Sequence, residues 1–255
     1  MEIKPIKFTR TRATPAEESA SGLAPHFAAL AAEVNARYRS VYGGASGGAD
    51  AVALLGVIAE FIALMDDLDG EFGSDGVLPV EGLDEAADQV LRCLADLDAW
   101  LDRLDLAALR AALQAVVLGV SLWTMRHECA IRAVEPVVNA LAARANGASS
   151  RQETAAVFGM MQGMIEFLRP GLAADLERSD PQRPWRLLNL NFAIAGIRCG
   201  DEVLMRHAFE TLDRNLPYDC PGFYGEALEL AESAGLPAPI QEAIRAQTRK
   251  WTKVH

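Results

Sequence analysis

The sequence is short of cysteine, aromatic residues and long apolar runs, and the shortages exclude several classes of protein. Its four cysteines lie 36, 70 and 21 positions apart, with no CxxC pair and no histidine at zinc-finger spacing. Neither a disulfide framework nor a zinc finger is therefore expected. The first 15 residues carry charges where a secretion signal needs an apolar core. We expect a cytoplasmic protein with reduced thiols.

The apolar runs also stop short of a membrane span. The two most apolar windows, residues 51–65 and 111–125, have 15 residues each and are interrupted by Glu60 and Gln114. A spanning helix needs about 20 apolar residues. Both windows therefore predict helices buried in a protein core, and no membrane partner is expected.

What the chain does contain favours helix. Of its 255 residues, 51% are hydrophobic, many of them alanine, and 23% are charged, which is a globular balance with high helix propensity. Helical periodicity recurs between glycine and proline stops, without an alternating strand pattern. We predict an all-α fold of antiparallel helical hairpins, stacked as a bundle or a short right-handed solenoid. An extended arm over residues 1–13 would precede a single helical domain over 14–255, with a subdivision near 70–83 as an alternative.

The most regular pattern covers residues 83–108, where apolar positions recur at alternating steps of four and three. Such a narrow seam is typical of a helix packed against neighbours in a bundle. Asp102 and Asp105 indicate a break near residue 104, with Asp105 as the N-cap of a second helix. One long helix reaching Met125 is the alternative. A further helix is expected over 127–145.

Part of the C-terminal half resembles a tetratricopeptide repeat, in which aromatic, aliphatic and small residues pack at fixed intervals. The matching positions are Trp185, Leu188, Phe192, Met205 and Ala208. The positions that depart from the motif are Asn189, Asp201 and Asp213, and no second copy lies 34 residues away. The resemblance implies a similar layout of stacked helical hairpins and does not extend to family membership.

Negative charge is concentrated in one segment. The net charge is −11, and residues 50–105 contain 15 acidic residues against only Arg92 and Arg103. Such a surface disfavours nucleic acid and attracts a basic protein or peptide. Its simpler interpretation is a solvated helix face that keeps the protein soluble. The acidic residues chosen as candidates for a partner surface are Asp96, Asp98 and Asp102.

Motifs that would support catalysis or metal binding fail on spacing or context. Asp66-Asp67-Leu68-Asp69 has glycine where a DDxxD magnesium cluster needs its third acid. Residues 44–48 spell GxSxG, but no strand precedes Ser46 as a nucleophile elbow requires. A di-iron bundle needs two Glu-x-x-His pairs, and this chain has one reversed pair at His207. We therefore expect no catalytic residue, no metal and no cofactor.

The helix predicted over residues 183–199 carries apolar side chains on two faces, so Asn189 should be buried. An unpaired buried amide costs about 1–3 kcal/mol. Bridging neighbouring helices is its favoured role, and contact with a ligand is the alternative. If a ligand pocket lies between helix pairs, its candidate residues are Trp185, Arg186, Asn189, His207 and Arg214.

Three functions follow from these patterns. The leading hypothesis is a protein-binding helical scaffold or adaptor without catalytic activity. The alternative is a small-ligand or metal-binding helical protein, or an enzyme, with a pocket between helix pairs. The third is an acidic inhibitor or immunity-type protein that covers a basic target with residues 50–105.

Overall fold

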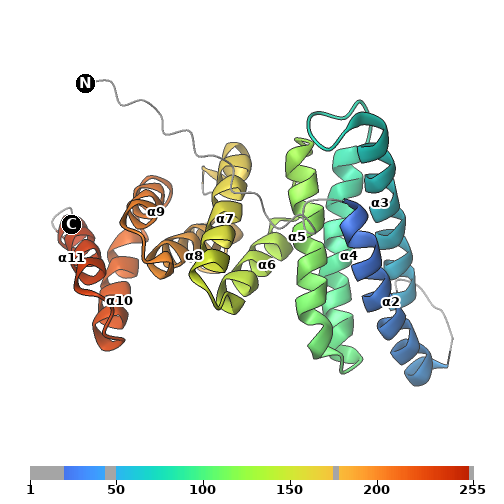
Figure 1. Ribbon diagram of the computed structural model, residues 1–255, viewed down its shortest axis with the longest axis horizontal. Coiled ribbons are helices and arrows are strands. Elements are labelled where there is room, and N and C mark those ends of the chain that lie inside the picture. The colour runs from blue at the N-terminus through green and yellow to red at the C-terminus, as the bar shows by residue number, and fades with distance from the viewer. Residues whose placement is uncertain (1–19, 44–49, 175–177, 253–255) are drawn as a thin grey trace. The chain divides into compact units, whose positions relative to one another are not determined.

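The computed structural model describes residues 20–43, 50–174 and 178–252, which form α-helices, one short 3-10 helix and no strand (Figure 1). The all-α prediction is confirmed. The predicted arm over residues 1–13 lies outside the described residues. The helices are α2 (Ala20–Tyr42), α3 (Ala51–Phe72), α4 (Leu83–Arg103), η1 (Ala107–Leu109), α5 (Arg110–Arg126), α6 (Val134–Gly147), α7 (Arg151–Leu172), α8 (Pro184–Cys199), α9 (Glu202–Asn215), α10 (Cys220–Ser233) and α11 (Ala238–Thr252).

The chain divides into two compact units, and the division falls between Arg144 and Ala145, inside α6. We call them the N-terminal unit and the C-terminal unit. The sequence suggested a single domain or a subdivision near residues 70–83. That connection joins α3 to α4 within the N-terminal unit.

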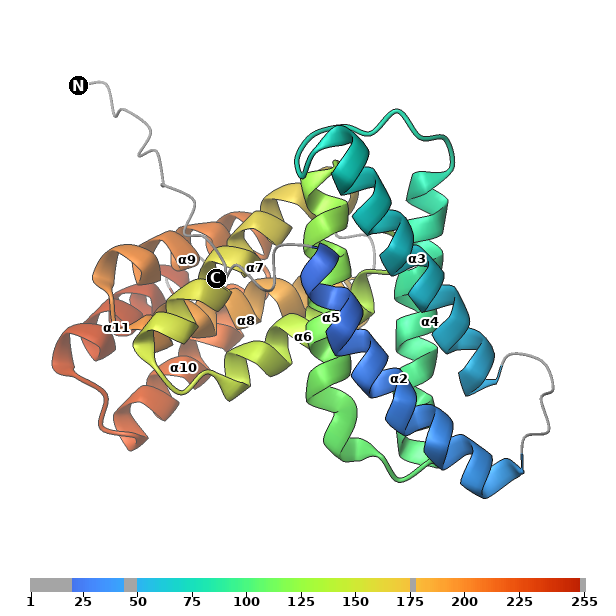
Figure 2. The same ribbon diagram turned by 45° about the vertical axis from the view of Figure 1, so that its right-hand side comes forward.

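In the N-terminal unit, α2, α3, α4 and α5 pack as a ring of four neighbours around one core (Figures 1 and 2). The apolar seam predicted from residue 83 faces this core, since Leu94, Leu97 and Leu101 are fully buried. The close approach of α2 and α5 depends on Gly119, because a Cβ there would lie 2.3 Å from the side chain of Leu23.

The break predicted near residue 104 is present, but its mechanism differs from the prediction. Asp105 has a φ of +57° and follows the end of α4, so it does not cap the next helix. The N–H of Leu106 donates to the carbonyl of Leu101 at 2.8 Å, and that of Asp105 to Asp102 at 3.1 Å. These two bonds form a Schellman motif, which ends a helix with a left-handed residue. The predicted N-cap role of Asp105 is therefore wrong.

The helix expected over 127–145 begins seven residues later than predicted, at Val134. Glu128 has a φ of +57° and ends α5 through the same motif, in which the N–H of Cys129 donates to Thr124 at 3.0 Å. The next residues form no helix, and two aspartates of α4 accept their backbone N–H groups. These bonds are Ala130 to Asp84, Arg132 to Asp88 and Ala133 to Asp88.

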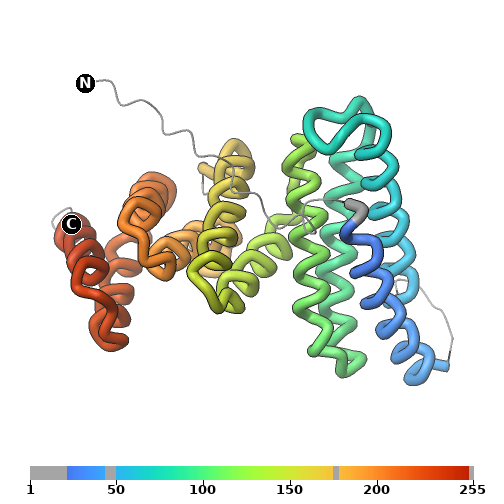
Figure 3. Tube along the Cα trace, viewed as in Figure 1, coloured from blue at the N-terminus to red at the C-terminus, as the bar shows by residue number. Residues whose placement is uncertain are grey.

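In the C-terminal unit, α8 packs against both α7 and α9, and α10 packs against α11 (Figure 3). Phe158, Leu188 and Phe192 are buried between these helices. Gly196 allows the close contact of α8 with α9, because a Cβ at that position would lie 2.7 Å from the Cβ of Ala208. The spacing of α8 and α9 is therefore set by two small residues.

One described stretch, Ala107–Arg126, is long and apolar enough to cross a membrane by length and composition. Of its most apolar window, 56% is buried inside the protein. A buried core helix passes the same test, so the stretch is weak evidence for a membrane span.

Candidate functional site

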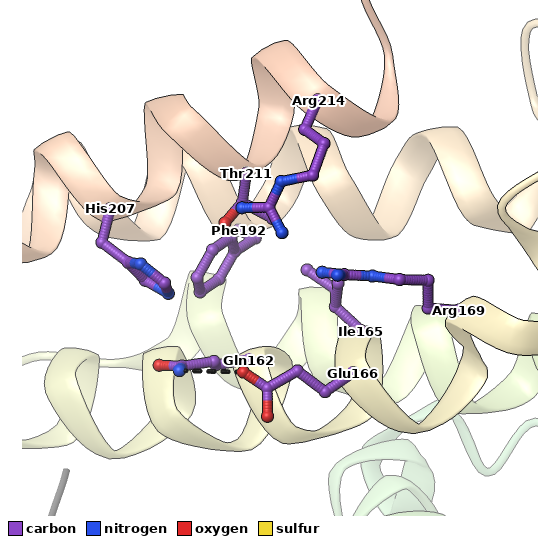
Figure 4. Close-up of a pocket in the computed structure, with 8 residues that line it drawn as sticks. All are labelled: Gln162, Ile165, Glu166, Arg169, Phe192, His207, Thr211 and Arg214. Carbon is purple, nitrogen blue, oxygen red and sulfur yellow. Dashed lines mark hydrogen bonds between the residues drawn. The ribbon is translucent and has the colours of Figure 1, made fainter. Parts of the chain in front are cut away.

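A pocket of about 190 Å³ lies in the C-terminal unit, between α7 and α9 and above α8 (Figure 4). Helix α7 supplies four of the lining residues, α9 supplies three, and Phe192 of α8 forms part of the floor. The lining residues are Gln162, Ile165, Glu166, Arg169, Phe192, His207, Thr211 and Arg214.

The sequence defines the start of each helix that carries the pocket. Helix α7 begins with a capping box, in which Ser150 and Glu153 each accept a backbone N–H from the other. Helix α8 has Pro184 in its first turn and ends at Gly200, whose φ is +62°. Asp201 then caps α9 by accepting the first free N–H groups of that helix.

Two arginines give the pocket its charge. The guanidinium groups of Arg169 and Arg214 extend into the space between α7 and α9 from opposite sides (Figure 4). Neither group forms an ion pair within residues 20–43, 50–174 and 178–252. The Nε of Arg169 is buried and has no hydrogen-bond partner there. The pocket therefore presents positive charge with unused donors.

Two uncharged polar side chains and one carboxylate complete the polar part of this lining. Thr211 is only 4% exposed, and its hydroxyl makes no hydrogen bond within the described part of the chain. Gln162 donates from Nε2 to the carboxylate of Glu166 at 3.1 Å. Glu166 is the acidic residue of the lining. A bound anion could accept hydrogen bonds from both guanidinium groups and from Thr211.

His207 adds an imidazole ring at one end of the pocket. Burial lowers its pKa from the usual range, and Arg214 acts in the same direction, whereas Glu166 and Glu210 oppose them. Burial of the ring therefore disfavours its charged form. Its edge meets the ring of Phe192, with ring centroids 6.0 Å apart.

This set of side chains suits an anion better than a metal ion. Guanidinium groups donate planar pairs of hydrogen bonds to carboxylate or phosphate oxygens and cannot coordinate a cation. No group of three or more His, Cys, Asp and Glu residues with metal-binding geometry lies within the described residues.

Of the five pocket residues proposed from the sequence, His207 and Arg214 line the pocket. The other three lie elsewhere on α8. Trp185 is buried at 3% exposure, and Arg186 binds Asp219 at 2.6 Å. Asn189 donates to the carbonyl of Trp185 at 2.8 Å and accepts from Asn215 at 2.7 Å, so it joins α8 to the end of α9.

The sequence interpretation did not include Arg169, Thr211, Gln162 or Glu166. A signal was present, because polar residues follow each other at steps of four and three on both helices. On α7 these are residues 162, 166 and 169, and on α9 they are 207, 211 and 214. This spacing places each set on one helix face, but only the structure brings the two faces together.

The proposed acidic surface of the N-terminal unit is partly engaged within the fold. Asp98 and Asp102 each bind Arg110 at 2.7 Å, and Asp96 is exposed. Asp69 accepts from Trp123 Nε1 at 2.7 Å and lies 3.0 Å from Nε2 of the buried His127. A considerable share of the acid in this segment therefore serves the structure of the unit.

Comparisons with known proteins identify no relative: no family model matches the sequence, and neither the curated proteins nor the solved structures give a significant match.

Proposed function

We propose that the protein is a helical scaffold or adaptor without catalytic activity, and that the pocket of the C-terminal unit receives an acidic group of a partner protein. The observation that carries this proposal is the pair of guanidinium groups, from Arg169 and Arg214, that face one cavity and form no ion pair among the described residues, although Glu166 lines the same cavity. Thr211, whose side chain is 4% exposed, lines the same cavity.

Charge and burial together support an external partner. The Nε of Arg169 is buried without a hydrogen-bond partner among the described residues, and a buried donor left unpaired costs stability. A carboxylate from another molecule would supply the missing acceptors.

The arrangement of helices is part of the same proposal. We take α7 to α11 as consecutive antiparallel hairpins in a short right-handed solenoid, whose repeated helices present an extended surface to a polypeptide. The packing of α8 with α7 and α9 and of α10 with α11 supports this layout. The cytoplasm is the proposed location, where the four buried cysteines are free thiols.

The experiment is a pulldown from the native host with the full chain. Wild type should recover a stoichiometric partner, and the double variant Arg169→Gln/Arg214→Gln should lose it. Arg206→Gln is the matched control, because Arg206 is an exposed arginine of α9 outside the pocket. Recovery of no partner, or equal recovery by the double variant, would contradict the proposal.

A second candidate is a small-ligand carrier, which the small cavity of about 190 Å³ and its buried Phe192 favour. Pockets for drug-sized ligands usually measure about 300–1,000 Å³, so only a small anion would fit. Native mass spectrometry of the purified protein would reveal such a molecule as a bound mass that Arg214→Gln removes.

The third candidate, an inhibitor that covers a basic target, relies on the acidic residues left exposed on the N-terminal unit. Asp96 tests it more cleanly than Asp98 or Asp102, because reversing either of these also breaks a bond to Arg110. If Asp96→Lys leaves the partner from the pulldown bound at full strength, this surface does not carry the interaction.

A further inference from the structure

Building on the proposed function, we infer that the acidic group received by the pocket is a phosphoryl group, carried by a phosphorylated serine or threonine side chain of the partner. Arg169 and Arg214 each bind a pair of its terminal oxygens, and the hydroxyl of Thr211 donates to it. All three residues line the same cavity.

The first step is the direction from which the two arginines approach. Figure 4 shows their guanidinium groups reaching into the space between α7 and α9 from opposite sides, Arg169 from α7 and Arg214 from α9. A guanidinium binds an anion best when two parallel N–H groups meet two of its oxygens. A carboxylate has a single pair of oxygens, so it satisfies only one guanidinium in this way. A phosphoryl group has three terminal oxygens, which can be taken in pairs from more than one side.

The second step is the supply of donors. No described residue accepts a hydrogen bond from the guanidinium of Arg169 or Arg214, and the Nε of Arg169 is buried. Each guanidinium carries several N–H donors, and Thr211 adds a hydroxyl. Hydrogen bonds to an ionised acceptor are stronger than bonds between neutral groups. An anion with three terminal oxygens therefore pairs more of these donors than a carboxylate does.

The third step is the balance of charge. Arg169 and Arg214 attract an anion, and Glu166 repels it. Glu166 is exposed, and its carboxylate accepts from Nε2 of Gln162 at 3.1 Å, so solvent and this bond screen its charge. Arg169 is half-buried and is screened less, whereas Arg214 is exposed and contributes mainly through its hydrogen bonds. With two cations against one screened carboxylate, the pocket favours the ligand with the larger negative charge.

The fourth step is size. The cavity of about 190 Å³ is larger than the engineered cavity of about 150 Å³ that holds one benzene molecule. A phosphoryl group fits this space together with the carbon that carries it. Drug-sized ligands need about 300–1,000 Å³, so a nucleotide would leave its base and sugar outside. Because the lining includes the exposed residues Glu166 and Arg214, the cavity is open to solvent and a side chain can enter it from a partner's surface.

Three labelled peptides, bound to the full chain and followed by fluorescence polarisation, test the inference. Each has the sequence Gly-Ser-Gly-X-Gly-Ser-Gly with both ends blocked, and X is phosphoserine, glutamate or serine. We expect the phosphoserine peptide to bind about tenfold or more tightly than the glutamate peptide, since a carboxylate leaves the second guanidinium without its pair of charge-assisted bonds. The serine peptide should show no saturable binding.

Variants of the chain make the test specific to the pocket. Arg169→Gln and Arg214→Gln should each weaken binding of the phosphoserine peptide about tenfold or more. Arg206→Gln, which removes an exposed arginine outside the pocket, should leave it unchanged. Glu166→Gln should strengthen binding about two- to fivefold, which is the size of an exposed charge interaction, and a gain of affinity does not arise from misfolding. The melting temperature of each variant is measured alongside, so that a loss of binding without a loss of thermal stability is assigned to the pocket.

The pulldown distinguishes a phosphoryl group on a partner from free phosphate. Treating the lysate with a phosphatase should remove the partner that the wild-type chain recovers from untreated lysate. Native mass spectrometry of the purified protein supplies the other arm. If it finds inorganic phosphate that Arg169→Gln/Arg214→Gln removes, and the phosphatase leaves the partner bound, the phosphoryl group comes from free phosphate and its place on a partner side chain is refuted.

Each other outcome overturns a stated part. Equal binding of the glutamate peptide refutes the phosphoryl group, and binding that neither arginine variant weakens refutes the pocket. A Kd of the phosphoserine peptide above about 1 mM refutes the inference as a whole. The adaptor function fails separately, if the pulldown recovers no partner or one that Arg169→Gln/Arg214→Gln retains. It stands without this inference if the double substitution removes the partner and the phosphatase does not.

Discussion

In the N-terminal unit, acidic side chains are engaged within the fold, whereas in the C-terminal unit two arginines line a cavity and form no ion pair with any described residue. Asp84 and Asp88 accept backbone N–H groups from the segment before α6, while Arg169 and Arg214 line the pocket. The N-terminal unit carries the larger formal charge, yet Asp84 and Asp88 are hydrogen-bonded within it, whereas the two pocket arginines of the C-terminal unit form no ion pair among the described residues. The number of charged residues in a segment therefore does not tell how many of those side chains are available to bind a partner.

Removing one engaged carboxylate should have the largest effect. Asp88 is 6% exposed and accepts the N–H groups of Arg132 and Ala133 together with the guanidinium of Arg92. Asp88→Ala should lower the free energy of unfolding of the N-terminal unit by about 3 kcal/mol, since buried donors lose their acceptor. Urea unfolding followed by tryptophan fluorescence measures it. Asp96→Ala is the exposed control. An equal loss of unfolding free energy in Asp96→Ala would show that the bonds of Asp88 within the fold add nothing to stability.

The same substitution has a predicted pH dependence. Burial tends to raise the pKa of Asp88, but the N–H of Ala133, the guanidinium of Arg92 and the N–H of Arg132 together lower it below its usual range. A depressed carboxyl pKa stabilises the fold above the unfolded-state value of about 3.9 and loses that contribution as pH falls through the folded-state value. The stability gap between wild type and Asp88→Ala should therefore narrow below about pH 4.

Asp213 is a comparably engaged carboxylate of the C-terminal unit. Asp213 accepts from the hydroxyl of Tyr224 at 2.8 Å, Nε1 of Trp251 at 2.9 Å and Nζ of Lys250 at 2.5 Å, so it joins α9 to α10 and α11. Asp213→Ala should cost about 2 kcal/mol and loosen α11 first. Hydrogen exchange of residues 238–252 would report it. Glu229→Ala is the exposed control. If residues 238–252 are protected from exchange equally in Asp213→Ala and in Glu229→Ala, Asp213 does not hold α11 in place.

A change in the opposite direction is expected at Glu128. Its φ of +57° places a side chain in the left-handed region, which costs about 1–2 kcal/mol for residues other than glycine. Glu128→Gly relieves this strain, partly offset by greater freedom of the unfolded chain. The N-terminal unit should gain about 0.5–1 kcal/mol in the same urea experiment. A loss of stability would mean that the Glu128 side chain has a structural role.

The smallest effect is expected at the pocket. Arg214→Gln should change the stability of the C-terminal unit by less than about 0.5 kcal/mol, because Arg214 has no ion pair to lose within the described chain. Thermal unfolding measures it. Destabilisation as large as that of Asp213→Ala would show that the arginine is structural, and the contrast between the two units would fail.

The elements that depend on local pattern could be predicted from the sequence. The seam that includes Leu94 and Leu97 identified the core face of α4, and Pro184 and Gly200 bounded α8. The left-handed conformation of Glu128 could not be predicted, because glutamate rarely adopts it, and that of Asp105 was missed because aspartate is also a common N-cap residue. Asp88 gave no local sign that it would accept N–H groups from residues more than 40 positions away.

Two of the eight residues that line the pocket were named from the sequence. His207 and Arg214 were expected in a pocket between helix pairs, and both line the cavity. Arg169 escaped notice because its role depends on which face of α7 meets α9. Asn189 was found as a buried amide, but its partner Asn215 lies on another helix. Residue spacing predicts which side chains share one face of a helix. A site formed by two helices can be predicted only when it is known which faces pack together.

The contact of Gly196 with Ala208 also sets a dimension of the pocket. Both arginines are carried by helices that rest on α8, and α9 approaches α8 as closely as these two small residues permit. Any larger side chain at position 196 would lift α9 and widen the gap between the two guanidinium groups. The absence of a side chain at Gly196, on the face of α8 that meets α9, thus sets the width of the binding site. Gly196→Ala offers a way to adjust ligand preference without altering any residue that lines the cavity.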